Sequence, residues 1–389
     1  MKNLSILMLC VIITSFGCKK EIKDIVDNTA WDTVQINKVQ VLASHNSYRK
    51  RTYDPILQMV MTIKSSLPAS LNPEDWDYTH IPLPEQFNNY GVRSIELDVY
   101  YDHDGGRFYN RAGMGLIGES VESGIPQLKE PGYKILHIPD VDFETNYYTF
   151  KQALETIKDW SNAHPRHLPI YIYVETKQET AGDRLPLSGF VKGIPYTLAY
   201  MDELDAEIKA VFGADLEKVI TPDKFRGSYA TLREAALANN WPTLKEARGK
   251  IIFVMNGEGM DAYRSGKTTL EGRAMFVFAD SSNASDAAFI IRNAPIGNEA
   301  AIANLVKQGF MVRTRADHST EAARNNDYTE ANAAFASGAQ IVSTDYYRPD
   351  YRCDTSSIYS CYSVKMPNGK LARVSPAFAN YSVNADIRE

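Results

Sequence analysis

The chain is poor in cysteine and carries no excess of basic residues. Four cysteines in 389 residues exclude a fold held together by many disulfides. The formal net charge of −6 argues against a nucleic-acid partner, and nothing in the sequence predicts a protein partner. Beyond the first residues, no apolar run is long enough to span a bilayer, and no glycine-rich phosphate motif follows a candidate strand.

Residues 1–17 are typical of a signal peptide. A basic start at Lys2 precedes an apolar run that ends at Phe16, shorter than the ~20 residues of a membrane span. The run leads into Gly17-Cys18, which resembles a bacterial lipoprotein signal, where the cysteine becomes the lipidated N-terminus. We therefore expect an exported lipoprotein, anchored through Cys18 on either face of the bacterial outer envelope, with residues 18–37 as a tether. Ordinary signal-peptide cleavage, with Cys18 incidental, is the alternative.

Two cysteines remain for the folded part of the chain. Cys10 leaves with the signal peptide and Cys18 is the expected lipidation site, so Cys353 and Cys361 form an even pair. In an oxidising compartment this pair predicts a disulfide that closes a short loop. Two free surface thiols are the alternative, whereas a zinc site would need further ligands that this spacing lacks.

Short apolar runs alternate with helical patterns along residues 38–389. Most of the runs are continuous, as in the strands of a buried parallel sheet, and the alternation is typical of α/β proteins. Eight such strands predict a single closed (β/α)8 TIM barrel, with an insertion of loops and helices around residues 178–249. A doubly wound open sheet is the alternative. The predicted strands are Val39–Ala43, Arg93–Tyr100, Tyr133–His137, Pro169–Val174, Lys250–Met255, Ala274–Phe278, Gly309–Thr314 and Gln340–Thr344, and the predicted helices are Thr149–Ala163, Tyr200–Phe212, Asn298–Gln308 and Asp327–Ser337.

Polar side chains fall at the ends of four consecutive predicted strands. In a barrel of this kind the carboxyl ends of the strands meet at one rim, where active sites lie. Four strands would therefore deliver polar groups to one place, and buried charges are rare unless they are paired or functional. In chain order these groups are His45 and Asn46, then Glu96 and Asp98, then His137, then Glu175.

The Glu96-Leu-Asp98 motif indicates a cation site. Residues two apart on a strand point to the same side, so both carboxylates face one way. Two negative charges this close need a cation or a shared proton. With Glu175 and the amide oxygen of Asn46, the site offers only hard oxygen ligands, which suit Ca²⁺ or Mg²⁺ and argue against zinc. Taken alone, the two carboxylates could equally lie on a solvated strand face.

Two histidines flank this group of carboxylates. A hard cation beside imidazoles suits phosphodiester cleavage, because the cation neutralises phosphate charge and an imidazole can protonate the leaving oxygen. His45 and His137 are the histidines at predicted strand ends. A hydrogen-bonded core histidine remains the alternative for His137, and His103, which lies nearer to Asp98 in sequence, is the fallback for its role.

The ordered set of motifs resembles the phosphoinositide-specific phospholipase C family, and in particular its bacterial calcium-dependent branch. The resemblance covers residues 38–350. One departure is that His137 lies 39 residues beyond Asp98, whereas the eukaryotic enzymes place their second histidine soon after this motif. The motifs are Val41-Leu-Ala-Ser-His45-Asn46-Ser-Tyr48, Glu96-Leu-Asp98, Gly105-Gly106-Arg107-Phe108, Asp159-Trp160-Ser161, Tyr173-Val-Glu175-Thr-Lys177, Arg313-Thr-Arg315-Ala-Asp317 and Ser343-Thr344-Asp345.

The resemblance implies a phospholipase C-like phosphodiesterase barrel with one Ca²⁺. It implies cleavage of a phosphatidylinositol-type lipid at a membrane surface into diacylglycerol and a cyclic or open inositol phosphate. Lys177 and Arg315 could equally be surface or paired charges. The implied metal ligands are Asn46, Glu96, Asp98 and Glu175, the implied catalytic residues are His45, His137 and, as base, Glu96, and the implied substrate contacts are Lys177, Arg315 and Asp345.

Two other functions remain open from the sequence. A glycerophosphodiester phosphodiesterase uses the same barrel and a similar late Thr344-Asp345 pair, but that family places Arg where this chain has Asn46. A non-catalytic surface lipoprotein that binds inositol phosphates or glycans is the second alternative, against which the complete ligand set argues. Activity on glycerophosphocholine without activity on phosphatidylinositol would favour the first.

Overall fold

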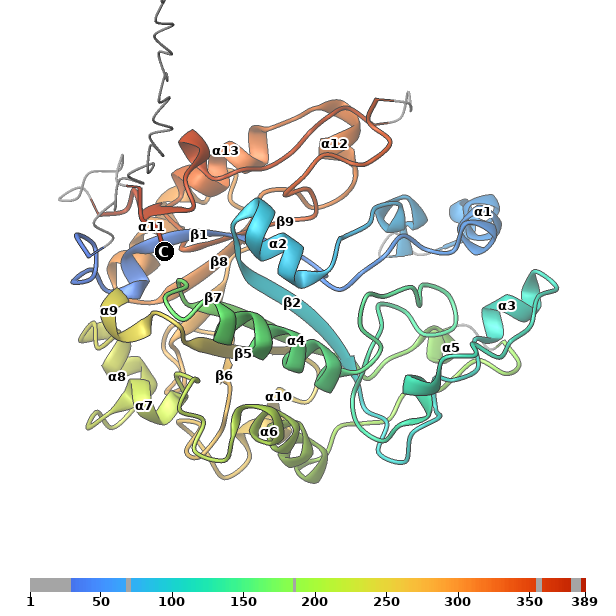
Figure 1. Cartoon of the computed structure of the whole chain (residues 1–389), viewed down its shortest axis with the longest axis horizontal. Coiled ribbons are helices and arrows are strands. Elements are labelled where there is room, and N and C mark those ends of the chain that lie inside the picture. The colour runs from blue at the N-terminus through green and yellow to red at the C-terminus, as the bar shows by residue number, and fades with distance from the viewer. Residues whose placement is uncertain (1–28, 68–70, 185–186, 355–358, 379–385) are drawn as a thin grey trace, which may run out of the picture.

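The core of the protein is a parallel eight-stranded barrel, seen in a computed structural model that describes residues 29–67, 71–184, 187–354, 359–378 and 386–389 (Figure 1). Neighbouring strands follow the order β6-β5-β4-β2-β1-β9-β8-β7, and all these pairs are parallel. The strands are β1 (Val39–Ser44), β2 (Val92–Tyr100), β4 (Ile170–Thr176), β5 (Ile251–Gly257), β6 (Phe276–Val277), β7 (Phe289–Ile291), β8 (Met311–Arg315) and β9 (Ile341–Thr344).

The barrel closes through one short contact between its terminal strands. A parallel bridge joins Phe278, just beyond β6, to Phe289 in β7, and the Ala279 N–H donates to the Phe289 carbonyl at 2.9 Å. Every residue of β2 is buried, as expected where side chains fill the barrel on one face and helices cover the other. The predicted TIM barrel is therefore confirmed, and a doubly wound open sheet is excluded.

One predicted strand was placed wrongly and one was missed. Tyr133–His137 forms only β3 (Lys134–Ile135), which pairs antiparallel with Val99 and Tyr100 of β2 and lies outside the barrel. The missing barrel strand is β7, whose apolar segment is three residues long. The other seven predicted strands overlap barrel strands. His137 therefore reaches the barrel rim from a connecting segment and not from a strand end.

The four predicted helices are present with small shifts in their ends. In α4 the Thr149 side chain accepts from the Gln152 N–H, which caps the first turn, and Phe150, Leu154 and Ile157 form the buried face. The longer helices are α2 (Leu83–Tyr90), α4 (Phe150–Ala163), α6 (Leu198–Phe212), α11 (Glu299–Lys307) and α13 (Thr329–Ala336). The shorter ones are α7 (Pro222–Arg226), α8 (Leu232–Leu237), α9 (Leu244–Ala247), α10 (Met260–Arg264) and α12 (Glu321–Asn325).

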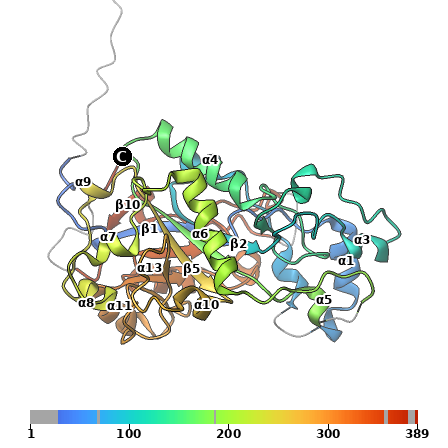
Figure 2. The same ribbon diagram turned by 90° about the horizontal axis from the view of Figure 1, so that it is seen from below.

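A lobe stands beyond the carboxyl ends of the strands, at the right of both Figure 1 and Figure 2. It is built by α1 (Asp54–Thr62), η4 (Pro73–Trp76), α3 (Ala112–Leu116), η5 (Pro126–Lys129) and α5 (Ala181–Arg184), which come from three different connections of the barrel. The lobe has its own buried cluster, which includes Ile56, Trp76 and Phe143. Gly113 in α3 permits close packing, because a Cβ there would lie 2.1 Å from the Asp140 carbonyl oxygen.

The folded part begins earlier than predicted. Val34 and Ile36 are buried, and the Ile36 N–H donates to the Pro242 carbonyl at 3.0 Å, so the end of the expected 18–37 tether packs on the barrel. At the other end of the chain, β10 (Ala372–Val374) pairs antiparallel with β1. The predicted signal peptide and Cys18 lie outside the described residues. In the part of the chain that the structure describes, no helix has the length and apolar character needed to cross a membrane.

Cys353 and Cys361 form the predicted disulfide. Their Cα atoms are 5.0 Å apart and the bond closes a loop with a sequence separation of 8. The alternative of two free thiols is therefore excluded.

Candidate active site

Three carboxylates converge at the carboxyl ends of β2 and β4. In the register of these parallel strands Asp98 lies directly beside Glu175, and Glu96 lies two residues earlier on the same face of β2. One oxygen from each of the three groups lies within 4.8 Å of the others. Glu96 and Asp98 are buried and Glu175 is half-buried. The strand period and the parallel register together explain why residues 77 positions apart along the chain meet here.

Two cations, Arg313 beside Glu96 and Lys177 beside Asp98, face three carboxylates, so the group carries more negative than positive charge. Burial and the neighbouring Glu175 and Asp98 raise the pKa of Glu96 to about 8, although Arg313 acts in the opposite direction. Burial also raises the pKa of Asp98. Burial acts to raise the pKa of Glu175, but Lys177, a hydrogen bond with Glu96 and the nearby His45 and Arg313 together lower it. A bound divalent cation would allow all three groups to be negative.

The residues present fit a Ca²⁺ ion. Oxygen ligands lie ~2.3–2.6 Å from Ca²⁺, so two of them on one ion are at most about 5 Å apart, in keeping with the 4.8 Å limit for this group. Among the described residues, Oδ1 of the buried Asp98 has no hydrogen-bond partner, and Oδ2 meets only the ammonium of Lys177. Buried oxygens without donors are what a cation would satisfy.

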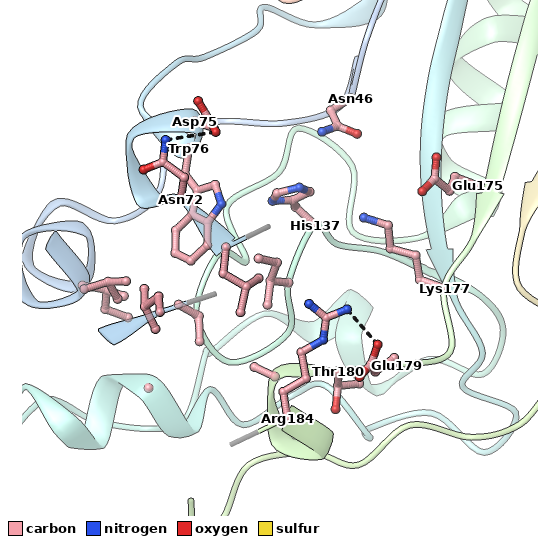
Figure 3. A pocket seen from close by; sticks show the side chains of 18 of the residues that line it. Asn46, Asn72, Asp75, Trp76, His137, Glu175, Lys177, Glu179, Thr180 and Arg184 are labelled. Carbon is pink, nitrogen blue, oxygen red and sulfur yellow. Dashed lines mark hydrogen bonds and ion pairs between the residues drawn. The ribbon is translucent and has the colours of Figure 1, made fainter. Parts of the chain in front are cut away.

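Asn46 adds an amide beside these carboxylates. Its φ of 45° lies in the left-handed region, which Asn tolerates, and turns the chain just after β1. Its Nδ2 donates to the Tyr78 hydroxyl at 3.4 Å, which leaves the amide oxygen for another partner. The turn is fixed against β2, because the Ser47 N–H donates to the Glu96 carbonyl at 2.9 Å and the Ser47 hydroxyl accepts from the Glu96 N–H at 2.8 Å. In Figure 3 Asn46 and Glu175 lie on the same side of the pocket.

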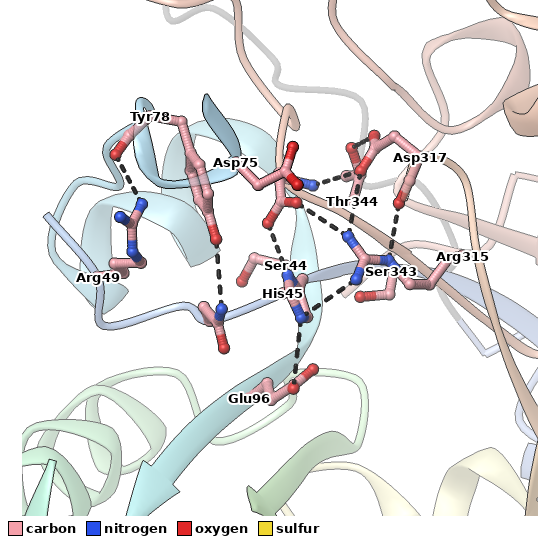
Figure 4. A network of polar contacts seen from close by, with 12 residues as sticks. Ser44, His45, Arg49, Asp75, Tyr78, Glu96, Arg315, Asp317, Ser343 and Thr344 are labelled. Carbon is pink, nitrogen blue, oxygen red and sulfur yellow. Dashed lines mark hydrogen bonds and ion pairs between the residues drawn. The ribbon is translucent and has the colours of Figure 1, made fainter. Parts of the chain in front are cut away.

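His45 is held by a carboxylate and a guanidinium (Figure 4). Its Nδ1 lies 2.8 Å from Oδ1 of Asp345, which follows β9, the strand next to β1. Arg315 donates to Asp345 Oδ2 at 2.9 Å and lies 3.3 Å from His45 Nε2. Burial and Arg315 lower the pKa of His45 to about 3, so the imidazole is neutral with its proton on Nδ1. Asp345, predicted as a substrate contact, has both oxygens engaged by these two partners.

His137 forms a second histidine–aspartate pair that sequence reasoning did not identify. Its Nδ1 lies 2.6 Å from Oδ2 of Asp142, five residues further along the same turn. Asp142 also accepts from the fully buried Arg49, at 2.9 and 2.7 Å, and from the Thr52 hydroxyl at 2.6 Å. Burial would raise the pKa of Asp142, but Arg49 and His137 hold it at about 2. Nδ1 is thereby tied to the carboxylate and Nε2 is left for the pocket.

One cavity of about 530 Å³ brings most of the predicted site residues together. Glu96 and Asp98 are buried beside it, within the carboxylate group that includes Glu175. Lys177 and Arg315 line the cavity although both are also paired, with Asp98 and Asp345 respectively. Of the predicted site residues, the cavity is lined by His45, Asn46, His137, Glu175, Lys177, Arg315 and Asp345.

His103 does not join the site. Its side chain is 61% exposed and pairs with Glu203 at 3.0 Å on the surface. His80 supports the position of His45, because its Nε2 lies 2.8 Å from the His45 carbonyl oxygen. The arrangement thus presents two oriented imidazoles beside a carboxylate group that fits a cation, which suits proton transfer at a phosphodiester.

Comparisons with known proteins agree with this chemistry. The sequence model of the family described as "Phosphoinositide phospholipase C, Ca2+-dependent" matches residues 34–376. A calcium-dependent phosphoinositol-specific phospholipase C from the Gram-negative bacterium Pseudomonas sp, in a myoinositol complex, has a similar fold, with a TM-score of 0.51 and 16% identity over 89% of this chain and 97% of that one. A second crystal form of that enzyme gives a TM-score of 0.52 and 15% identity over 89% and 96%. No curated protein matches the sequence.

Proposed function

Because the chain belongs to the Ca²⁺-dependent phosphoinositide phospholipase C family and is therefore a phosphoric diester hydrolase, we propose that it cleaves a phosphatidylinositol-type lipid into diacylglycerol and a cyclic inositol phosphate. The observation that carries the proposal is the placement of two histidine–aspartate pairs around the three carboxylates, in one cavity at the barrel rim. A barrel that had lost its activity and only bound ligands would not require both imidazoles to be held in a fixed orientation.

Ca²⁺ would be held by Asn46, Glu96, Asp98 and Glu175. When bound, it neutralises charge on the phosphate and lowers the pKa of the attacking hydroxyl. Lys177 and Arg315 would supply further positive charge on the two sides of the phosphate. The positive charge of Lys177 and Arg315 also offsets the three carboxylates at this end of the cavity, which would otherwise repel an anionic substrate.

The reaction begins with attack of the inositol 2-hydroxyl oxygen on phosphorus, while a carboxylate oxygen of Glu96 accepts the hydroxyl proton. The bond from phosphorus to the glycerol oxygen breaks, and Nε2 of His137 donates a proton to that oxygen. An anionic phosphate beside His137 favours the imidazolium, and Asp142 stabilises it. Arg315 lies beside His45 Nε2. When a bound phosphate accepts the hydrogen bonds of Arg315, Nε2 is free to carry a proton. The protonated His45 then stabilises the negative charge that develops on the phosphoryl oxygens.

Asp142→Asn should lower kcat on phosphatidylinositol by at least about tenfold, because an amide can donate to Nδ1 and no longer stabilises a charged imidazole. The loss should shrink for an inositol phosphodiester of p-nitrophenol, whose leaving oxygen needs no proton. Steady-state rates on both substrates check this expectation. Asp140→Asn is the matched control, since Asp140 lies in the same turn as Asp142 and accepts from the Ala112 and Val191 N–H groups, at 2.8 Å each. An equal loss on both substrates would assign Asp142 a structural role.

The proposed function is tested by a substrate panel with and without Ca²⁺. We expect cleavage of phosphatidylinositol, with a cyclic inositol phosphate as the first product in ³¹P NMR spectra. Cleavage of glycerophosphocholine with none of phosphatidylinositol would instead identify a glycerophosphodiester phosphodiesterase. Intact lipids after incubation with protein and Ca²⁺ would leave only a binding function.

We also propose that the protein is exported and lipid-anchored at Cys18. The proposal rests on the sequence of residues 1–18, and the Cys353–Cys361 disulfide supports export, because disulfides persist in oxidising compartments. Mass spectrometry of the N-terminal peptide from the mature protein tests it. A peptide that begins at an unmodified residue other than Cys18 would disprove the anchor.

A further inference from the structure

The cavity that contains the two histidines continues from the barrel into the lobe. Its volume of about 530 Å³ is within the ~300–1,000 Å³ of small-molecule sites. The barrel end is lined by charged groups such as Glu175, Lys177 and Arg315. In Figure 3 His137 lies between Glu175 and Lys177 on one side and Trp76 on the other. His137 thus marks the boundary between a polar half and the half that the lobe builds.

The lobe half of the cavity is lined mainly by apolar side chains from three segments of the chain. Ile56 and Val60 come from α1, Leu116 from α3, and Leu187 and Phe190 from the segment after α5. Polar residues also line it, and they are paired with one another or with the backbone, as where the Thr180 hydroxyl donates to the Val191 carbonyl at 2.6 Å. Arg184 donates to Glu179 at 2.7 Å, and Asn72 donates to Asp75 at 3.2 Å. This half therefore favours an apolar occupant.

The apolar lining reaches the surface at the outer end of the cavity. Ile63, Leu116 and Leu187 line the cavity and are nevertheless 46%, 52% and 39% exposed. Single exposed apolar residues are ordinary, but three from separate segments at the rim of one cavity indicate a binding surface. A long apolar group could lie along the lining and leave the cavity at this rim.

We propose that the lobe half of the cavity binds the acyl-glycerol portion of a single substrate lipid; the inference rests on the proposed function and adds a chain-binding subsite to it. The geometry of proton transfer fixes the direction. His137 must face the glycerol oxygen that leaves, so the glycerol lies on the lobe side and the inositol lies toward the charged barrel end. The acyl chains then extend over Ile56 and Val60 toward Leu116 and Leu187.

The inference predicts that a longer chain improves cleavage of a monomeric lipid. Each methylene moved from water into an apolar site is worth up to about fourfold in binding. For phosphatidylinositols with acetyl, butanoyl and hexanoyl chains, all below their critical micelle concentrations, kcat/KM should rise at least about tenfold from the shortest to the longest. Monomeric substrates are essential, since they separate binding in the cavity from adsorption to a lipid surface.

Ile63→Asp, Leu116→Asp and Leu187→Asp should each flatten this dependence on chain length, because a carboxylate at the rim disfavours the chain. Leu237→Asp at the end of α8, away from the lobe and outside this cavity, is the matched control with 43% exposure, and should keep the native dependence. Leu116→Ser and Leu187→Ser give a milder pair if an aspartate lowers the yield of folded protein.

The outcomes distinguish this inference from the proposed function. The subsite alone would be overturned if the native enzyme cleaved the three lipids equally well whatever their chain length. It would also be overturned if the rim variants kept the native dependence on chain length. A rise that occurs only above the micelle concentration would assign the apolar rim to contact with a lipid surface and overturn the subsite as well. If none of the three lipids is cleaved but long-chain phosphatidylinositol is, the subsite alone is overturned. If long-chain phosphatidylinositol also stays intact, the proposed function is overturned, and the subsite with it.

Discussion

Cleavage of phosphatidylinositol should fall by about a thousandfold or more when Ca²⁺ is chelated, and should return when Ca²⁺ is restored in excess. The physical reason is the charge at the carboxylate group, where burial raises the pKa of both Glu96 and Asp98. Without a cation the group cannot offer three ionised ligands, and the phosphate loses several kcal/mol of charge stabilisation, which is worth about three powers of ten in rate. Initial rates with excess chelator, and then with added Ca²⁺, measure the effect.

The same expectation can be checked without turnover. Ca²⁺ should bind with one ion per chain in calorimetry and raise the melting temperature, because a ligand that binds only the folded state stabilises it. Asp98→Asn and Glu175→Gln should abolish both the heat of binding and the shift. Glu207→Gln is the matched control, since Glu207 is a half-buried carboxylate that accepts from the Tyr133 N–H at 2.7 Å and does not line the cavity. Full activity in excess chelator would contradict the calcium site.

The carboxylate group was predictable from the sequence because it depends on regular geometry. The two-residue period of β2 and the parallel register with β4 are enough to place Asp98 beside Glu175. His45 and Asn46 were predictable for the same reason, since they follow β1 directly. Wherever a site residue sits at the end of a barrel strand, its neighbours are set by the fold class.

The second histidine–aspartate pair could not be predicted in this way. His137 and Asp142 come from a connection that folds into the lobe, and Arg49, which neutralises Asp142, comes from a different connection. Their meeting depends on how the two connections pack, which no local pattern encodes. A histidine five residues before an aspartate in a polar turn was the one available signal.

The two errors in the strand assignment share a cause. Tyr133–His137 has the composition of a buried strand, but only two of its residues pair in β3, at the edge of β2. Phe289–Ile291 is too short to be distinguished from a turn or a helix end, yet it completes the barrel through Phe289. Whether a short apolar segment forms a strand depends on its tertiary partners. The predicted number of barrel strands is therefore correct, although one predicted strand lies outside the barrel and β7 takes its place.

Replacement of either active-site histidine by alanine should reduce kcat on phosphatidylinositol by about a hundredfold or more, the usual scale for a proton donor or a charge-stabilising group. The two losses should differ in their dependence on the leaving group. His137→Ala removes the proton for the glycerol oxygen, so its defect should shrink on an inositol phosphodiester of p-nitrophenol. His45→Ala removes stabilisation of the phosphoryl oxygens, which every substrate needs, so its defect should persist.

His103→Ala is the matched control, because this histidine also lies beside a carboxylate, Glu203, but is exposed and does not line the cavity. Its kcat should equal the native value on both substrates. A large loss in His103→Ala with a near-normal His137→Ala would transfer the acid role to His103 and separate the Asp142 pair from catalysis. A His137→Ala defect of equal size on both substrates would show that this imidazole stabilises the transition state and does not protonate the leaving oxygen. The leaving-group comparison therefore tests the direction in which the lipid lies in the cavity, since only a histidine on the glycerol side can act as the acid.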